Sequence, residues 1–222
     1  MKQQDTIGQF VCQVFVCPPE VGEQLLAIGQ LRSYSTEAAI VRQGERVTRC
    51  YLLVAGRARS FLYTSGGQVV LLHEYRRGDV FGALGDPEAA IQDTDVVAQD
   101  AVEALVMQAS HLAMLAQQHG CIGLALSRLL ILRLRKATER IFERSGLSSV
   151  GRVHAELLRQ ARLRPDLVIS PAPVLADLAL LVATTRETAS RAVGALERRG
   201  IIRRDGASLV VVAPHRLEEM IL

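Results

Sequence analysis

The chain has 222 residues, a mass of 24.2 kDa and a composition that is 49% hydrophobic, 22% charged and only 4% aromatic. This length accommodates one large domain or two small ones, and the hydrophobic fraction argues against intrinsic disorder. No run of about 18 uncharged apolar residues occurs, and the first residues lack the apolar stretch of a signal peptide. We therefore expect a cytoplasmic protein without a membrane span.

The net charge of +3 lies entirely in the last third of the chain. Residues 1–144 contain 15 Lys or Arg and 15 Asp or Glu, whereas residues 145–222 contain 11 Arg and 8 Asp or Glu. Arginine is suited to bidentate contacts with phosphates and guanine, so this excess favours nucleic acid as a partner. A solvated surface with a chance excess of three charges is the alternative explanation.

The N-terminal part begins with a predicted short helix over residues 18–30, because Val21, Leu25 and Ile28 recur at helical spacing. From about Arg32 to Met107, short apolar or alternating runs are separated by turn signals, which predicts an antiparallel, jelly-roll-like β-roll. The predicted strands are Cys50–Val54, Ala58–Tyr63, Val69–His73, Val96–Ala98 and Ala104–Met107, with a hairpin loop at Tyr63–Gly67.

Two helices are predicted after the β-roll, a short one over Ser110–Gln118 and a long one over Cys121–Arg144. The long helix has an apolar stripe with steps of 4, 4, 3 and 4 residues, formed by Leu126, Leu130, Leu134, Ala137 and Ile141. Such a stripe is typical of a coiled-coil seam, so we expect homodimerisation. Packing of the stripe on the chain's own β-roll is the alternative.

The next segment continues with a predicted helix that Ser148–Ser149 can cap. Its apolar positions are Val153, Leu157, Leu158 and Ala161, and it ends before Arg164–Pro165. A short extended piece, Leu167–Ser170, follows.

Residues 173–212 predict a winged helix-turn-helix. After a first short helix and a break at Ala183–Thr184, Thr185 can cap a second helix, which Gly200 ends in the usual C-terminal position. Two short strands joined by the turn Asp205–Gly206 then predict a β-hairpin.

Polar side chains gather at the start of this second helix, which is the part that reads base edges in helix-turn-helix proteins. We predict DNA contacts by Thr184, Thr185, Arg186, Glu187, Thr188, Ser190 and Arg191. Arg can donate two hydrogen bonds to guanine, and Glu can accept one from cytosine. Stabilisation of the helix dipole is the alternative role for Glu187.

The chain resembles the CRP/FNR superfamily of transcription regulators over nearly its whole length. The residues that match are Arg42–Glu45, Tyr51–Gly56, Gly78–Gly82 and Thr185–Arg191. The resemblance implies a homodimer joined through the long helix, binding to a near-palindromic DNA site, and contact with RNA polymerase. It also implies that Arg186, Glu187 and Arg191 read the major groove of a half-site with G·C pairs.

The effector pocket departs from the family pattern. Cyclic-nucleotide-binding members use Gly-Glu to bind ribose and Arg-Ser to bind the phosphate, whereas the matching positions here are Gly82–Ala83 and Asp93–Thr94. A carboxylate at Asp93 would repel a phosphate, so we do not expect cyclic AMP binding. The pocket that the resemblance implies would be lined by Leu72, Phe81, Gly82, Ala83, Leu84 and Thr94.

The metal cofactors of the family are not expected either, because their ligands do not match. An iron–sulfur cluster needs a tight N-terminal cysteine group, and Cys12 and Cys17 are too few and too widely spaced. A haem of the CO-sensing kind needs Cys and His just after the Gly-Asp turn, where Gly82 and Leu84 stand. No zinc spacing and no disulfide framework is evident among the four cysteines, so we expect free thiols.

The sequence thus predicts an α+β protein with a β-roll sensor domain (1–118), a dimerisation helix (119–144) and a winged helix-turn-helix DNA-binding domain (145–222). The predicted function is a sequence-specific transcription regulator that is not an enzyme, because no catalytic arrangement of residues is evident. The alternative is a small-molecule or redox sensor whose winged helix docks a protein partner. The effector, the target genes and the direction of regulation stay open.

Overall fold

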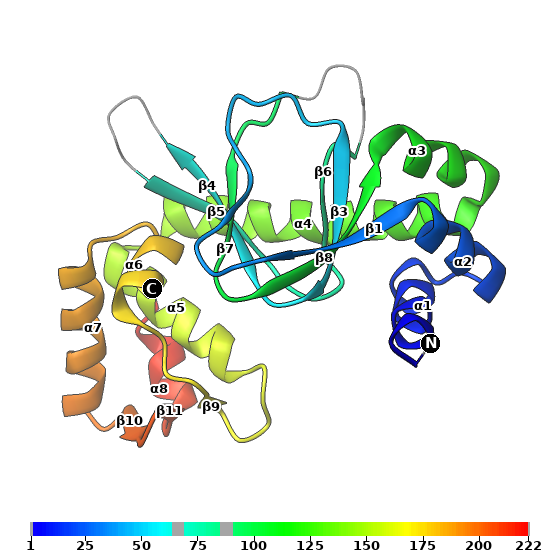
Figure 1. Cartoon of the computed structure of the whole chain (residues 1–222). Helices are drawn as coiled ribbons and strands as arrows, with labels where there is room; N and C mark the ends of the chain where they lie inside the picture. The colour runs from blue at the N-terminus through cyan, green and yellow to red at the C-terminus, as the bar shows by residue number, and fades with distance from the viewer. Residues whose placement is uncertain (1, 64–68, 85–90, 222) are drawn as a thin grey trace. The chain divides into compact units, whose positions relative to one another are not determined.

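The computed structural model describes residues 2–63, 69–84 and 91–221 (Figure 1). Its internal contacts divide the chain into two compact units, Met1–Leu134 and Arg135–Leu222. The long helix α4 (Gly120–Gly146) contributes residues to both units.

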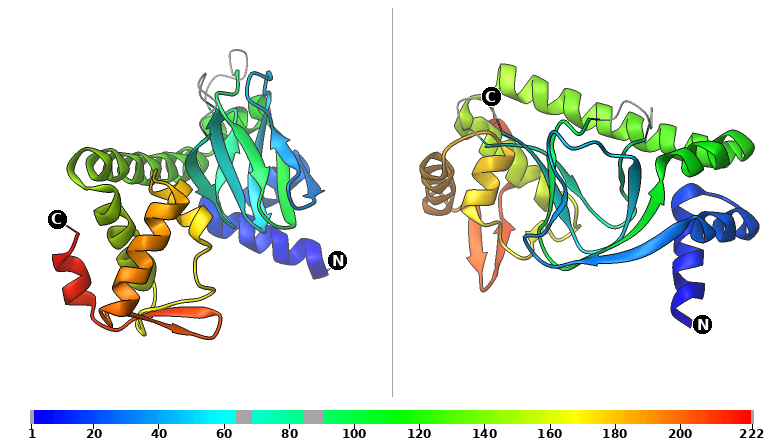
Figure 2. Two further views of the ribbon diagram at one scale, coloured as in Figure 1. Left: turned by 90° about the vertical axis from the view of Figure 1, so that its left-hand side faces the viewer. Right: turned by 45° about the horizontal axis from the view of Figure 1, so that its top comes forward.

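The first unit contains two four-stranded antiparallel sheets (Figures 1 and 2). One sheet has the order β1 (Gly29–Tyr34), β8 (Val102–Gln108), β3 (Arg49–Ala55) and β6 (Val80–Gly82). The other has the order β2 (Ala39–Val41), β7 (Asp95–Ala98), β4 (Ala58–Tyr63) and β5 (Val69–Tyr75). The first strand pairs with the last, so the predicted jelly-roll-like β-roll is confirmed. The predicted hairpin loop after Tyr63 lies outside the described residues.

Strand β3 shows how the roll is held together, because both of its faces are buried. Cys50, Leu52 and Val54 point into a cluster shared with the helices, whereas Tyr51 and Leu53 point into a cluster formed by residues of both sheets. This alternation follows from the two-residue period of a strand. The central strand therefore joins the helical layer to the interior of the roll.

The helices of the first unit are α1 (Lys2–Phe15), α2 (Pro19–Ala27), α3 (Ala109–Gln118) and the start of α4. Helix α1 was not predicted, and the helix predicted over residues 18–30 is too long. Gly29 and Gln30 instead begin strand β1, because they pair with Met107 and Val106 of β8. No single described helix is long and apolar enough to cross a membrane, although α3 and α4 together meet that test across a bend of 116°.

The second unit is a winged helix-turn-helix, as predicted. Its elements are α5 (Ser149–Ala161), β9 (Val168–Ile169), α6 (Leu175–Leu181), α7 (Arg186–Arg198), β10 (Ile202–Asp205), β11 (Ser208–Val211) and α8 (Pro214–Glu219). The apolar side chains predicted for α5 are all buried, together with Leu178, Ala189, Val193 and Leu196. Strand β9 pairs with β11 and widens the hairpin to three strands, a pairing that the sequence did not indicate.

Candidate nucleic-acid interface

The first turn of α7 is fixed by the cap that the sequence predicts. The Thr185 hydroxyl accepts a hydrogen bond from the Thr188 backbone N–H at 3.1 Å and lies 3.0 Å from the Thr188 hydroxyl. This cap satisfies one of the free amides at the helix start and sets where the following side chains project. At the other end, Gly200 has a φ of +66° and its N–H donates to the Glu197 carbonyl at 2.9 Å. That conformation suits glycine and ends the helix as expected.

The side chains of α7 divide cleanly into two faces. Ala189, Ala192, Val193 and Leu196 are buried in the core of the second unit. The opposite face of the first two turns is solvent-exposed and is formed by Arg186, Glu187, Ser190 and Arg191. Thr185 is also exposed, and Thr184 and Thr188 are half-buried. The predicted DNA-contacting residues are therefore brought together at one end of one helix.

Glu187 and Arg191 form an ion pair along this exposed face, with 3.8 Å between carboxylate and guanidinium. Their side chains are 78% and 72% exposed, so the pair contributes little to stability. It places an acceptor beside the Arg191 guanidinium. Arg186 has no ion-pair partner among the residues that the structure describes. The helix start thus presents two exposed arginines, one of them beside a carboxylate, and arginines are suited to phosphates and guanine edges.

The turn between α6 and α7 is held by an arginine that the sequence analysis did not single out. Arg152 on α5 donates hydrogen bonds to the carbonyls of Val182 and Ala183 at 2.8 and 3.0 Å, and to that of Leu147 at 2.9 Å. Ala183 has a φ of +52°, which is uncommon for a residue other than glycine. Arg152 therefore fixes the sharp turn that positions the start of α7.

The wing adds two further arginines outside the predicted set. Arg203 and Arg204 on β10 are exposed and pair with Asp205 at 3.8 Å and Glu197 at 2.6 Å. The Arg204–Glu197 pair ties the wing to the last turn of α7. Arginines on an exposed hairpin beside a recognition helix can contact the DNA backbone. The sequence indicated the hairpin but not that these side chains are exposed.

Along α4, most of the predicted dimerisation stripe is exposed to solvent. Leu130, Leu134, Ala137 and Ile141 are exposed, whereas Leu126 packs partly against the core of the first unit. Further exposed apolar side chains on this helix are Leu124, Ile131, Leu132 and Phe142. So much exposed apolar surface on one helix is typical of an interface.

In the β-roll, the residues of the predicted effector pocket lie in different environments. Phe81 and Ala83 are buried in the cluster formed by both sheets, whereas the Leu72 side chain is 41% exposed. Gly82 and Leu84 are half-buried, as is Thr94, which accepts a hydrogen bond from the Gln92 amide at 3.1 Å. A side chain on Gly82 would come within 2.5 Å of the Arg49 carbonyl, so only glycine fits there.

Aromatic rings fill part of the interior of the roll beside Phe81. The rings of Tyr51 and Phe81 are stacked with centroids 5.1 Å apart, and Tyr75 lies 4.6 Å from Phe81. Burial raises the pKa of Tyr75 above its ordinary value. This environment is apolar around the position of Ala83, where cyclic-nucleotide-binding members have a carboxylate.

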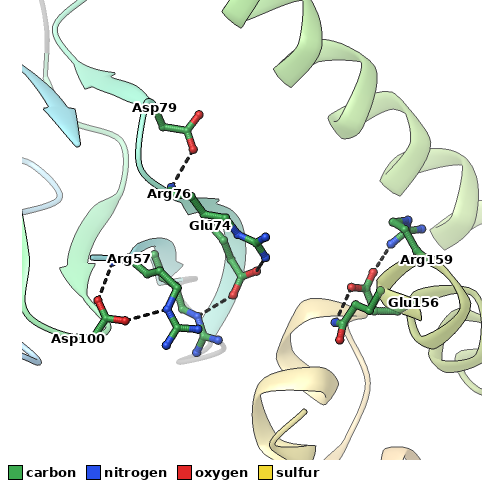
Figure 3. Close-up of polar contacts among 9 residues, drawn as sticks. Arg57, Glu74, Arg76, Asp79, Asp100, Glu156 and Arg159 are labelled. Atoms are coloured by element: carbon green, nitrogen blue, oxygen red, sulfur yellow. Dashed lines mark hydrogen bonds and ion pairs between the residues drawn. The ribbon is translucent and has the colours of Figure 1, made fainter. Parts of the chain in front are cut away.

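A positively charged side chain, Arg133, contacts the β-roll beside Tyr75, and it comes from α4 rather than from the strands. The Arg133 guanidinium donates to the Val80 carbonyl, lies 3.8 Å from the Asp79 carboxylate, and packs 5.2 Å from the Tyr75 ring centroid. Burial lowers the pKa of Arg133, and its Nε has no hydrogen-bond partner among the described residues. The Asp79 carboxylate also accepts from the Arg76 backbone N–H at 2.8 Å, fixing the Gly78–Asp79 turn (Figure 3). Arg133 is distant in sequence from the strands that it contacts, so the sequence did not predict this cation beside the roll.

No group of three or more His, Cys, Asp or Glu that could hold a metal ion occurs among the described residues. The four cysteines are all free thiols in the structure. Cys50 is buried, and the other three are half-buried.

Two family models match the chain. Residues 31–119 match a cyclic nucleotide-binding domain, and residues 151–220 match a Crp-like helix-turn-helix domain. The cAMP-activated global transcriptional regulator Vfr of Pseudomonas aeruginosa is 26% identical, covering 85% of this chain and 92% of that protein. The cyclic AMP receptor protein of Thermus thermophilus is 29% identical, covering 91% and 93%.

Solved structures show the same fold. FixK2 from Bradyrhizobium japonicum superposes with a TM-score of 0.75 at 22% identity, covering 87% of this chain and 97% of that chain. A CooA variant from Carboxydothermus hydrogenoformans gives a TM-score of 0.79 at 18% identity, covering 89% and 90%. With both family domains present in the family's order, the chain belongs to the CRP/FNR superfamily of transcription regulators.

Proposed function

We propose that this regulator reads a specific, near-palindromic DNA site as a homodimer, without acting as an enzyme. The observation that supports the proposal most strongly is the exposed start of α7, where Arg186, Glu187, Ser190 and Arg191 lie on one face. Thr184, Thr185 and Thr188 add hydroxyls for phosphate or base contacts beside them. In this proposal Arg186 and Arg191 donate to guanine, and Glu187 accepts from cytosine or orients Arg191.

The homodimer would form through the exposed apolar side chains of α4. Pairing of two such helices buries surface that is otherwise in contact with water. It would also relate the two α7 helices by a twofold axis, so that they enter successive major grooves roughly 34 Å apart. In this proposal residues 1–118 act as the sensor, 119–144 as the dimerisation helix and 145–222 as the DNA-binding domain.

We infer that cyclic AMP is not the effector, although relatives are named for it. Ala83 is buried among apolar side chains where a ribose-binding carboxylate would be needed, and the exposed Asp93 is negatively charged. The Arg133 guanidinium is already used by the Val80 carbonyl, by Asp79 and by Tyr75. Haem and an iron–sulfur cluster are not proposed. We propose that the β-roll takes a different small ligand or none.

By kinship with the family, the cytoplasm is the proposed location and RNA polymerase a proposed partner. Docking of the winged helix to a protein is the competing function. Salt separates the two, because phosphate contacts release counterions and make DNA affinity fall steeply with salt concentration.

The direct test replaces the two arginines singly and measures affinity for a selected DNA site by gel shift. Arg186→Ala and Arg191→Ala should each weaken binding by about 1–3 kcal/mol and relax base preference at one position of the half-site. The matched control is Arg164→Ala, which removes an exposed arginine outside α7 and the wing. Unchanged affinity in both α7 variants would contradict base reading by this helix.

A further inference from the structure

The connection between α1 and α2 brings two cysteines together. Cys12 lies on the last turns of α1, and Cys17 follows the end of that helix. Val16 between them has a φ of +48°, a left-handed conformation that is rare for a β-branched residue. This residue turns the chain back, so that the Cys17 backbone N–H donates to the Cys12 carbonyl at 3.1 Å. That bond keeps the two Cα atoms within the roughly 7 Å that a disulfide can bridge.

The surroundings of the two thiols are also shared. Burial first, and the neighbouring Cys12 second, raise the pKa of Cys17 to about 12. The Cys12 sulfur lies 3.8 Å from the Pro18 carbonyl oxygen and directly over Gly22 of α2. A Cβ at position 22 would be only 2.3 Å from that sulfur, so the glycine makes room for it.

Neither of the other two cysteines offers such an arrangement. Cys50 is buried on β3, where its thiol lies 3.6 Å from the Met107 carbonyl oxygen and burial raises its pKa to about 12. Cys121 at the start of α4 is half-buried, and no backbone hydrogen bond joins it to Cys12 or Cys17 among the described residues. Cys12 and Cys17 are both half-buried, so a small oxidant in solvent can reach them.

We propose that Cys12 and Cys17 form a redox-active dithiol, which a hydroperoxide oxidises to a disulfide that closes the α1–α2 turn. This modification site is separate from the DNA-reading face and does not depend on it.

The oxidation proceeds in two balanced steps. The Cys12 thiol loses its proton, and the thiolate attacks one oxygen of the hydroperoxide, which forms an S–O bond, breaks the O–O bond and gives a sulfenic acid on Cys12. The departing alkoxide, or hydroxide from hydrogen peroxide, takes up that proton and leaves as the alcohol or as water. The Cys17 sulfur then attacks the Cys12 sulfur, which forms the S–S bond and breaks the S–O bond. The departing hydroxide takes the Cys17 thiol proton and leaves as water. Two thiols lose two electrons in total, and the hydroperoxide gains them.

The Cys12–Cys17 pair lies beside the apolar cluster against which the start of α4 packs, so its oxidation can affect that helix. Phe10, Val11 and Phe15 of α1 are buried in the same cluster as Leu25 of α2 and Ile122 of α4. Cys17 and Cys121 both pack against this cluster. A covalent link across the α1–α2 turn would therefore stiffen the layer on which the first turns of α4 pack.

The test uses the full reduced chain, treated with hydrogen peroxide, denatured, alkylated with N-ethylmaleimide and digested with trypsin. Cleavage after Lys2 and Arg32 places both cysteines in one peptide, residues 3–32. We expect this peptide to be lighter by two hydrogen atoms and unalkylated, and two of the four thiols to be lost. Subsequent reduction should restore all four.

Four single variants locate the reaction. Cys12→Ser and Cys17→Ser should each abolish the disulfide peptide, whereas Cys50→Ser and Cys121→Ser should still form it. Circular dichroism checks that each variant is folded. If a serine variant is not folded, Cys12→Ala or Cys17→Ala is used in its place. Retention of all four thiols in the wild-type chain, or a disulfide that includes Cys121, would overturn the proposal.

Discussion

Arg152 and Arg133 each hold backbone from a distant segment, which is why the sequence did not reveal them. Arg152 donates to the Leu147 carbonyl, 5 positions away along the chain, and to the carbonyls of Val182 and Ala183, 30 and 31 positions away. In the sequence of α5, nothing distinguishes Arg152 from a charged residue on the protein surface. Thr185, by contrast, was predictable, because a cap is a local interaction with the next three residues.

Replacement of Arg152 tests its role in positioning α7. Arg152→Ala should lower the free energy of unfolding of the C-terminal unit by about 1–3 kcal/mol, because partly buried carbonyls lose their donors. DNA affinity should fall with it, since the α6–α7 turn is no longer fixed. Urea unfolding followed by circular dichroism measures the first effect. Arg162→Ala is the control, because its exposed ion pair with Glu218 contributes only about 0–1 kcal/mol. Equal losses in the two variants would argue against the positioning role.

The environment of His154 predicts how the stability of the C-terminal unit depends on pH. The side chain is buried, its Nδ1–H donates to the Met220 carbonyl at 3.0 Å, and its Nε2 has no partner among the described residues. Burial lowers the pKa of His154, and nearby Arg199 lowers it further. The unfolded chain therefore binds a proton at a higher pH than the folded chain does. Stability should be complete above about pH 6.5 and should fall as the pH drops below that value.

The variant His154→Asn isolates this effect, because its amide can keep the bond to the Met220 carbonyl without titrating. Thermal unfolding of both proteins over a pH series should show a smaller loss on acidification for the variant. The comparison cancels the opposite contribution of Glu156, whose pKa is raised by burial. Parallel pH profiles for the two proteins would show that His154 is not responsible.

The bounds of some elements follow from the local sequence pattern, whereas those of others depend on strand pairing with distant residues. The apolar spacing of α4, α5 and α7 and the stop at Gly200 predicted these helices almost to their ends. The end of α2 was wrong, because Gly29 and Gln30 pair with β8, about 75 residues away. The pairing of β9 with β11 and the contact of Arg133 with the roll likewise depend on distant residues. The cap and polar face of α7 were predictable from the sequence. The exposure of the wing arginines was not, because it depends on how β10 packs in the folded unit.

The exposed apolar side chains of α4 predict that substitutions on this helix can make the protein monomeric without unfolding it. Leu134 and Ile141 are 68% and 66% exposed, so they contribute little to the fold of one chain. Burial of each in a dimer should contribute about 1.5–3 kcal/mol, which corresponds to at least tenfold in the dissociation constant. The double variant Leu134→Glu, Ile141→Glu should therefore sediment as a monomer in analytical ultracentrifugation.

The matched control for this helix is Leu163→Glu, because Leu163 is 71% exposed but lies outside α4. It should leave the dimer intact. A double variant that stays dimeric would place the interface elsewhere on the molecule.

The whole molecule consists of a β-roll, a long helix with exposed apolar side chains and a winged helix whose α7 start and β10 carry exposed arginines. The positive charge excess in the last third coincides with the exposed arginines of α7 and β10. The β-roll shares its fold with cyclic-nucleotide-binding domains but lacks their ribose carboxylate and phosphate cation at the matching positions. Residues 151–220 match the Crp-like helix-turn-helix domain, whereas the β-roll departs from the cyclic-nucleotide pattern at Ala83 and Asp93.

The most direct test is selection of binding sites from a randomised DNA pool by the purified full chain, with and without cyclic AMP. We expect enrichment of a near-palindrome with half-sites about one helical turn apart, equally strong without the nucleotide. Absence of any enriched sequence, or enrichment only when cyclic AMP is present, would contradict it.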